Sequence, residues 1–221
     1  QQEIGGRYDF FRKALTALKF NAIEGDYAEF GCNGAMTFCM VHRLQTEYPY
    51  ELGPFHQWAF DSFQGLPEAA NSKDDHPRWI AGQWTTSIDD FHQRCAERGL
   101  PRSAYTVVPG FYEESLDSSA SGPRPDKIRL AYIDCDMYSS TQAVLRFLMP
   151  RLQHGMILAF DDYYCYSSKL PSGERMAAAE VFAGHPQWRL VPYAQYGWHG
   201  MSFVVEGVSA EMPDGLLPAF A

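Results

Sequence analysis

The chain has 221 residues, of which 46% are hydrophobic and 20% charged, and its formal net charge is −9 at pH 7. This length and even composition favour one sizeable core, so we expect a single domain over 1–221. The acidic excess, without any cluster of Lys and Arg, argues against nucleic acid as a partner. No apolar run approaches the roughly 20 residues of a membrane span, which argues against a membrane partner.

Five cysteines are scattered along the chain, and no two of them form a CxxC pair. An odd number of cysteines without such spacing favours free thiols and a reducing compartment. Residues 1–7 also lack the charged and then apolar order of a secretory signal. The sequence therefore predicts a cytoplasmic protein.

Helices and strands are predicted to alternate along most of the chain. Apolar residues at helical spacing indicate an N-terminal helix over 8–20. Further helices are expected over 35–44, over 88–98, from a cap at Ser139 or Ser140 to about 152, and over 173–182. Strands are expected over 26–31, 57–61, 105–108, 128–134, 156–160, 188–193 and 201–205. This order predicts an open α/β sheet, mostly parallel, with helices on both faces and an antiparallel strand at its C-terminal edge.

A polar segment interrupts this alternation between the second and third strands. Residues 71–83 are rich in Asp, His and Pro and show no periodicity, and Ser87 then caps the helix over 88–98. Long connections of this kind in small domains are typically functional. We therefore expect a mobile loop that covers a site, around residues 71–86.

Glycine and acidic residues stand where the predicted strands end. Gly31 ends the first strand, Asp61 the second, Asp134 the fourth, and Asp161 with Asp162 the fifth. Ligands of open α/β sheets bind beyond the carboxyl ends of the strands, so these residues should meet in one crevice. A glycine at the first turn permits close approach of backbone, and an acidic residue after the second strand can accept from both hydroxyls of a ribose. Together they predict a nucleoside-containing cofactor.

The aspartates at the ends of the fourth and fifth strands indicate a metal site. Asp134, Asp161 and Asp162 would repel one another unless a cation lay between them. Hard oxygen ligands suit Mg²⁺ or another divalent cation such as Mn²⁺ or Ca²⁺, rather than zinc. Asp136 is either a fourth ligand or a cap for the helix that starts near Ser139.

Four motifs in order give the chain a family resemblance. They are GDYAEFG over 25–31, FDSFQGLPE over 60–68, YIDCDMYSST over 132–141 and LAFDDYY, which ends at Tyr164. With these motifs the sequence resembles the macrocin O-methyltransferase family, a group of sugar methyltransferases that includes mycinamicin and novobiocin tailoring enzymes. The turn after EFG, with a single Gly34, is shorter and poorer in glycine than is common in that family.

The resemblance implies a Rossmann-like class I methyltransferase fold that binds S-adenosylmethionine. It implies metal ligation by Asp134, Asp161 and Asp162, and an oligomeric state is common among relatives, so a homo-oligomer is an open expectation. The implied cofactor residues are Glu29 and Gly31 at the methionine end, Asp61 with neighbouring Ser62 at the ribose, Gly110, Phe111 and Tyr112 near the adenine, and Asp134 between cofactor and metal.

The expected reaction is methyl transfer to a hydroxyl group of a small acceptor that contains a sugar. A coordinated cation can stabilise the developing alkoxide and hold two neighbouring oxygens, so we expect a vicinal diol or similar chelating acceptor. Asp134 or His199 could accept the proton. Catechol methyltransferases resemble this chain here but have a catalytic lysine at the position where Met137 and Tyr138 stand. The absence of that lysine favours an acceptor with an aliphatic hydroxyl. Aromatic residues that either wall the acceptor pocket or belong to the core or an interface are Trp79, Trp84, Tyr163, Tyr164, Tyr166 and Trp198.

Three other functions remain open from the sequence. A catechol or phenol O-methyltransferase would use the same metal site. A nicotinamide-dependent oxidoreductase would also place Asp61 on a ribose, but it needs a proper glycine fingerprint and gives the clustered aspartates no task. A nucleoside-cofactor-binding protein without catalysis is the third alternative.

Overall fold

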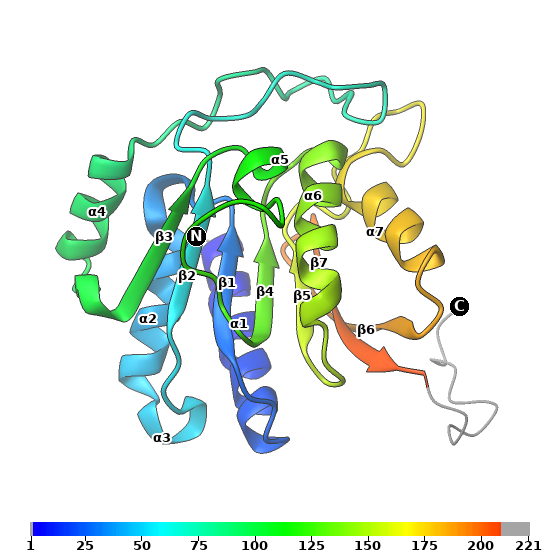
Figure 1. Ribbon diagram of the computed structural model, residues 1–221. Helices are drawn as coiled ribbons and strands as arrows, with labels where there is room; N and C mark the ends of the chain where they lie inside the picture. The colour runs from blue at the N-terminus through cyan, green and yellow to red at the C-terminus, as the bar shows by residue number, and fades with distance from the viewer. Residues whose placement is uncertain (1, 209–221) are drawn as a thin grey trace.

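The computed structural model describes residues 2–208, and its centre is a seven-stranded sheet (Figure 1). The strand order is β3-β2-β1-β4-β5-β7-β6. The strands are β1 (Asp26–Phe30), β2 (Gln57–Asp61), β3 (Tyr105–Pro109), β4 (Ile128–Ile133), β5 (Ile157–Phe160), β6 (Trp188–Tyr196) and β7 (Gly200–Gly207). The first five strands run parallel, whereas β7 is antiparallel to both β5 and β6. The mostly parallel sheet with an antiparallel C-terminal strand is confirmed.

Seven α-helices accompany the sheet in the described part of the chain. They are α1 (Gln2–Phe20), α2 (Met36–Glu47), α3 (Pro49–Leu52), α4 (Ile88–Glu97), α5 (Tyr112–Ser115), α6 (Tyr138–Leu148) and α7 (Gly173–Ala183). The sequence did not predict α3 and α5, because a single helical turn is too short to show a period. The turn after β1 is a short 3₁₀ helix, η1 (Asn33–Ala35).

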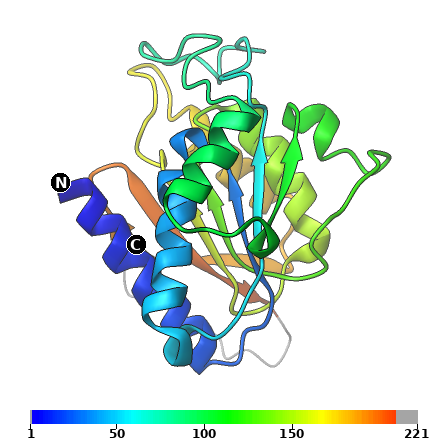
Figure 2. The same ribbon diagram turned by 90° about the vertical axis from the view of Figure 1, so that its left-hand side faces the viewer.

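The helices cover the sheet on both faces, as Figure 2 shows in side view. Alternate residues of a strand point to opposite faces, so Tyr27 packs with α1, α2 and α4, whereas Ala28 packs with α6 and α7. Each face thus has its own apolar cluster. The sheet between them is almost fully buried over β1, β4 and β5.

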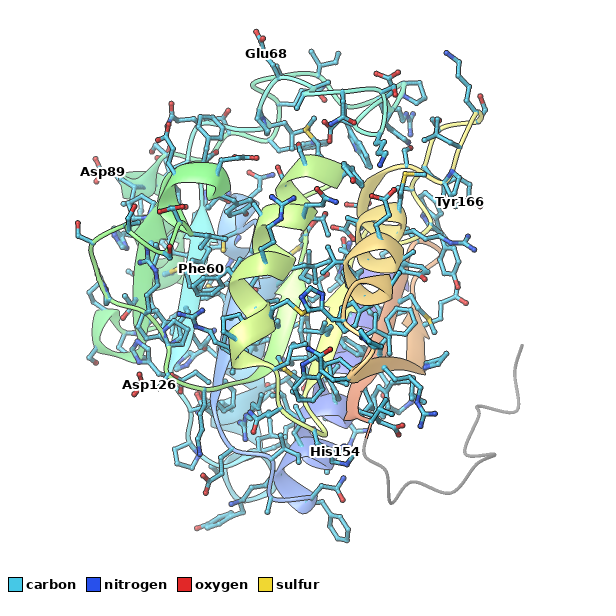
Figure 3. The ribbon with its side chains drawn as sticks, turned by 45° about the vertical axis from the view of Figure 1, so that its right-hand side comes forward. Phe60, Glu68, Asp89, Asp126, His154 and Tyr166 are labelled. Carbon is cyan, nitrogen blue, oxygen red and sulfur yellow. The ribbon has the colours of Figure 1, made fainter. Side chains whose placement is uncertain are left out.

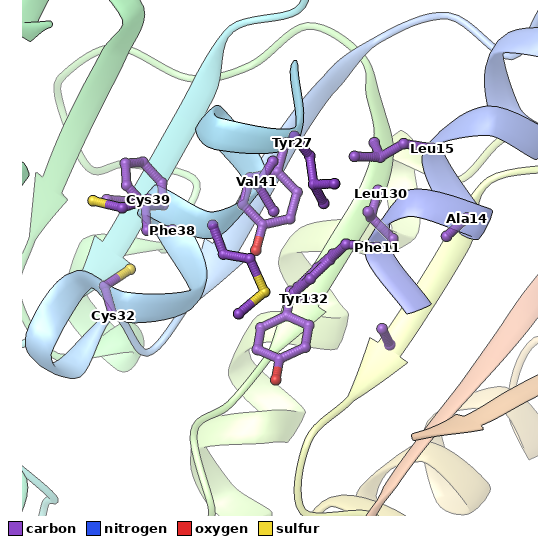
Figure 4. Close-up of a cluster of buried hydrophobic side chains, with 14 of the residues drawn as sticks. Phe11, Ala14, Leu15, Tyr27, Cys32, Phe38, Cys39, Val41, Leu130 and Tyr132 are labelled. Carbon is purple, nitrogen blue, oxygen red and sulfur yellow. The ribbon is translucent and has the colours of Figure 1, made fainter. Parts of the chain in front are cut away.

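The N-terminal helix belongs to the core. Phe11 of α1 is fully buried, and its ring lies 5.9 Å from that of Tyr27 and 5.0 Å from that of Tyr132 (Figure 4). Phe10 stacks on Tyr196 of β6 with ring centroids 4.3 Å apart. These contacts place the N-terminal half of α1 beside the carboxyl ends of β4 and β6.

Two predicted helix caps have different outcomes. Ser87 caps α4 as expected, and its hydroxyl accepts a hydrogen bond from the Asp90 amide at 3.1 Å. The expectation that Ser139 or Ser140 caps α6 is wrong, because the helix already begins at Tyr138. Asp74, which lies 65 residues earlier in the chain, accepts from the Ser139 amide at 2.8 Å in place of a local cap.

The polar segment 71–86, hereafter the lid, arches over the carboxyl ends of the strands (Figure 1). Backbone hydrogen bonds of Leu66 with Gly82 and Gln83 close its base. Lys73 donates to Glu180 of α7 at 2.7 Å, close to the Asp74 contact with α6. The lid is therefore fixed to two helices by its first residues.

Two further findings concern the helices and the cysteines of the described residues. Within residues 2–208, no helix combines the length and apolar character that crossing a membrane requires. All five cysteines are free thiols, and the Cys39 and Cys95 sulfur atoms lie 3.9 Å apart. Both apolar clusters pack on the same sheet.

Candidate active site

The register of the sheet aligns the residues that follow its central strands. Phe30 of β1 pairs with Ile133 of β4, and Ile133 pairs with Phe160 of β5. The ladder continues for one more residue, because the Asp134 amide donates to Phe30 and the Asp161 amide donates to Ile133, both at 2.8 Å. The sequence correctly placed these residues at one edge of the sheet.

A cavity of about 710 Å³ lies at this edge, below the lid. Figure 3 shows Glu68 and Tyr166 at this end of the molecule and His154 at the opposite end. The expected site residues that line the cavity are Gly31, Asp61, Ser62, Phe111, Tyr112, Asp134, Asp161, Asp162 and His199. Glu29 and Gly110 are absent from its lining.

Glu29 lies behind the cavity wall rather than in it. Its carboxylate is fully buried and accepts hydrogen bonds from Thr37 at 2.6 Å and Tyr27 at 2.5 Å. Burial raises the pKa of Glu29 to about 8, although the hydrogen bonds from Thr37 and Tyr27 act in the opposite direction. Thr37 itself lines the cavity, so Glu29 contacts a residue of the cavity wall without lining the cavity itself.

Asp61 is held at the end of β2 by two backbone donors. Its Oδ2 accepts from the Cys32 amide and its Oδ1 from the Phe63 amide, both at 2.7 Å. Burial raises its pKa, against the effect of these two bonds. Each carboxylate oxygen can accept more than one hydrogen bond, so both remain able to bind a further hydroxyl.

The turn after β3 adds a wall to the cavity beside Asp61. Gly110 donates its amide to the Asp61 carbonyl at 2.9 Å and thereby joins the ends of β2 and β3. Phe111 precedes α5, and the buried Tyr112 donates its hydroxyl to the Phe60 carbonyl at 3.2 Å. Phe111 and Tyr112 line the cavity, whereas Gly110 forms the turn that positions them.

The acidic residues converge as two overlapping groups. Carboxylate oxygens of Asp134, Asp136 and Asp162 lie within 4.8 Å of one another. Ligand atoms of Asp161, Asp162 and His199 form a second group at the same spacing. Asp162 is common to both groups. Asp136, which the sequence left open between ligand and helix cap, lies with the carboxylates and has a positive φ of 62°.

Burial and mutual repulsion affect the ionisation of this cluster. The pKa of Asp134 is raised first by burial and then by the charges of Asp161, Asp162 and Asp136. Asp136 and Asp162 are shifted in the same direction, mainly by burial. Closely placed carboxylates in a poorly solvated site, without zinc-type Cys ligands among the described groups, fit a hard divalent cation.

The carboxylate of Asp161 already has partners within the protein. Arg7 of α1 donates to it from Nε at 3.0 Å and from Nη2 at 2.5 Å, and the Tyr132 hydroxyl donates to the same carboxylate. Burial acts to lower the pKa of Arg7, but the bond to Asp161 and the negative charges nearby outweigh it and raise the pKa. Arg7 was not predicted from the sequence, because the predicted helix began at Tyr8.

His199 and Glu174 complete the surroundings of the cluster. His199 lies in the turn before β7, is buried, and places its Nδ1 2.5 Å from the Asp161 carbonyl oxygen. Glu174, in the first turn of α7, accepts from the Asp162 amide at 2.9 Å and from the Cys135 amide at 3.3 Å. Glu174 therefore fixes the backbone after β4 and β5. The sequence did not single it out, because an acidic residue in the first turn of a helix is ordinary.

Aromatic side chains surround the open side of the cavity. Trp79 and Trp84 come from the lid, and Tyr164 and Tyr166 from the loop after β5, while Trp198 comes from the β6–β7 turn. Trp84 and Trp198 are 59% and 64% exposed, an unusual exposure for tryptophan beside a cavity.

Tyr163 differs from its aromatic neighbours. Its ring packs on Phe160 and Phe203, with centroids 5.9 and 5.1 Å apart, so it belongs to the core and not to the cavity wall.

Comparison with known proteins agrees with this fold. Residues 4–176 match the family described as Macrocin-O-methyltransferase (TylF). The chain is 27% identical over 111 residues to 8-demethyl-8-(2,3-dimethoxy-alpha-L-rhamnosyl)-tetracenomycin-C 4'-O-methyltransferase of Streptomyces olivaceus, a match that covers 48% of this chain and 41% of that protein. It is 23% identical over 163 residues to demethyldecarbamoylnovobiocin O-methyltransferase of Streptomyces niveus, which covers 71% of this chain and 60% of that protein. The chain thus spans less than two thirds of the length of these curated relatives.

Solved structures show the same fold. The O-methyltransferase NovP superposes with a TM-score of 0.73 at 20% identity, over 90% of this chain and 79% of that one. CalS11, a calicheamicin methyltransferase, superposes with a TM-score of 0.63 at 22% identity, over 89% and 76%. The strand order is that of the class I methyltransferase fold. Within that class, the chain belongs to the macrocin O-methyltransferase family.

Proposed function

We propose that the protein is an O-methyltransferase that uses a divalent metal and transfers a methyl group from S-adenosylmethionine to a hydroxyl of a sugar in a natural product or glycan. The observation that carries the proposal is the order of side chains across the sheet. Tyr112 follows β3, Asp61 ends β2, Gly31 follows β1, and Asp134 and Asp161 follow β4 and β5. Adenine, ribose, methionine and acceptor would bind along this line in that order.

The cofactor half of the site is formed by the strand ends from β3 to β1. Phe111 and Tyr112 offer aromatic surface for an adenine, and both oxygens of Asp61 can accept from ribose hydroxyls. Ser62, next to Asp61, also lines the cavity. Gly31 and Thr37 line the methionine end, and Glu29 stands behind Thr37.

The acidic half would hold the divalent cation. Asp134 and Asp162 belong both to the triad expected from the sequence and to the group of three converging carboxylates. The third carboxylate ligand would be Asp161, as expected from the sequence, or Asp136, which completes the group in the structure. A bound Mg²⁺ supplies Lewis acidity that stabilises a developing alkoxide. The protein's own contribution is to fix the ligands, which Glu174 does through the backbone of Asp162 and Cys135.

His199 is the better placed of the two candidate bases. The Asp161 carbonyl can only accept, so Nδ1 of His199 carries the proton in that hydrogen bond, and in a neutral ring Nε2 is then the nitrogen that can accept a proton. His199 also lines the cavity. Asp134 is the alternative, because it also lines the cavity and its carboxylate could accept the proton of a neighbouring hydroxyl.

The exposed aromatic residues support an acceptor larger than a free sugar. Trp84, Tyr166 and Trp198 present apolar surface at the opening, where they could contact an apolar group attached to the sugar. The two curated relatives are named for acceptors of this kind. We further infer a reducing, cytoplasmic environment from the five free cysteines, and we leave a homo-oligomer as a proposal.

Methyl transfer with mass detection tests the function. The protein would be incubated with S-adenosylmethionine, Mg²⁺ and a panel of rhamnosyl glycosides, nucleotide-linked sugars and catechols. We expect S-adenosylhomocysteine to bind in calorimetry, NAD to bind weakly, and a sugar hydroxyl to be methylated. Methylation of catechols alone would establish the phenol-type enzyme. Cofactor binding without turnover on any acceptor would establish a binding protein.

A further inference from the structure

The first turns of α1 form part of the candidate active site. Arg7 and Glu3 line the cavity, although they lie more than 120 residues in sequence from the clustered aspartates that follow β4 and β5. Glu3 accepts from Nε1 of Trp198 at 3.1 Å, and Arg7 pairs with Asp161. Packing of Phe11 against Tyr132 holds this end of the helix in place.

The Arg7–Asp161 pair is two-pronged and poorly solvated. Nε and Nη2 of Arg7 donate to different oxygens of Asp161, at 3.0 and 2.5 Å. The side chains of Arg7 and Asp161 are only 14% and 5% exposed, so water screens their attraction weakly. A two-pronged Arg–carboxylate pair occupies the directions in which a carboxylate would bind a cation.

The same carboxylate belongs to a group that could hold a metal ion. Asp161, Asp162 and His199 bring their ligand atoms within 4.8 Å of one another. The Tyr132 hydroxyl also donates to Asp161, so the oxygens of Asp161 have three donors before any ion arrives. Ion binding there must compete with the positive charge of Arg7.

We propose that Arg7 is a positioning residue that competes with the divalent cation for the carboxylate of Asp161, and thereby sets the affinity of the metal site. The inference rests on the proposed metal-dependent function. Because the competition is mutual, an ion that binds Asp161 must weaken the hold of Asp161 on Arg7 and loosen the first turns of α1.

A binding titration with Mn²⁺ alone tests the competition. Calorimetry and electron paramagnetic resonance would compare the wild type with Arg7→Met, Arg7→Gln and Arg7→Lys. Removal of the charge in Arg7→Met and Arg7→Gln should tighten Mn²⁺ binding roughly 10-fold, whereas Arg7→Lys should stay near the wild type because it keeps the charge. Arg12→Met is the matched control, since Arg12 lies on the same helix with its side chain 43% exposed and, among the described residues, forms an ion pair with Asp9 alone, at 3.6 Å.

Hydrogen exchange gives a second reading that does not depend on activity. Saturating Mg²⁺ should raise amide exchange in the first turns of α1 in the wild type and leave it unchanged in Arg7→Met. Unchanged or weaker Mn²⁺ binding by both neutral variants would overturn the competition, and weaker binding would mean that Arg7 prepares Asp161 for the ion. Wild type that binds no Mn²⁺ would instead refute the metal part of the proposed function, and the competition with it.

Discussion

Gly31 and Asp134 meet backbone to backbone where β1 and β4 end. A Cβ atom added to Gly31 would lie 1.8 Å from the Asp134 carbonyl oxygen, and Gly31 has a φ of +93°. Both the contact and the backbone angle therefore require glycine here. The sequence left open whether Gly31 serves packing or cofactor approach, and the structure supplies the packing reason directly.

Gly31→Ala should disturb both folding and the site. The strained φ and the steric clash should lower the free energy of unfolding by at least about 2 kcal/mol, and S-adenosylhomocysteine should bind at least about 10-fold more weakly. Urea unfolding and calorimetry measure the two effects. Gly5→Ala in α1 is the control, because nothing lies within 4 Å of its Cβ position, and stability should stay equal or rise slightly. An unperturbed Gly31→Ala variant would refute the close approach.

The raised pKa of Glu29 should make the stability of the protein depend on pH. Its native pKa is about 8 and its ordinary value is 4.5, so between these values the folded protein binds a proton that the unfolded chain releases. Stability must therefore fall as pH rises through this window, by up to about 1.4 kcal/mol per pH unit.

Glu29→Gln should remove that contribution, because glutamine imitates the neutral acid and does not titrate. Urea unfolding at pH 5.5, 6.5 and 7.5 would follow the difference between variant and wild type, in which other titrating groups largely cancel. As pH rises, the free energy of unfolding of Glu29→Gln should increase steadily relative to that of the wild type. A difference independent of pH would mean that Glu29 is ionised throughout.

Asp74 connects the lid to α6. Its carboxylate accepts from the Ser139 amide at 2.8 Å, and from the amides of Ala70 and Asn71 at the start of the lid at 3.0 and 3.2 Å. Asp74→Ala should cost about 1–3 kcal/mol and expose residues 71–86 to limited proteolysis. The exposed neighbour Asp75 provides the control Asp75→Ala, which should behave like the wild type. Equal proteolysis of the two variants would show that Asp74 does not fix the lid.

Trp198 should affect acceptor binding and leave cofactor binding intact. Its exposed ring at the cavity opening should contribute to binding of a glycoside, so Trp198→Ala should raise KM for that acceptor about 10-fold with kcat little changed. Steady-state kinetics and S-adenosylhomocysteine calorimetry measure the two properties. Tyr50→Ala, 93% exposed on α3, is the control. If Trp198→Ala weakened S-adenosylhomocysteine binding as much as it raised KM for the acceptor, Trp198 would belong to the cofactor site and the prediction would be wrong.

Sequence patterns predicted the parts of the site that depend on local order. Gly31, Asp61 and Asp134 were placed correctly because parallel strands bring consecutive strand ends to one edge. Arg7 and Asp74 escaped prediction because their partners, Asp161 and Ser139, lie 154 and 65 residues away. No periodic pattern encodes such contacts, and the local serines near 139 were the more plausible caps from sequence alone.

The most direct test of the proposed mechanism is the initial rate of methyl transfer to a rhamnosyl glycoside before and after metal removal. Stripping with EDTA should lower the rate at least about 100-fold, and added Mg²⁺ should restore it. S-adenosylhomocysteine should bind the stripped protein with little change in affinity. An undiminished rate in EDTA would contradict the metal-dependent mechanism.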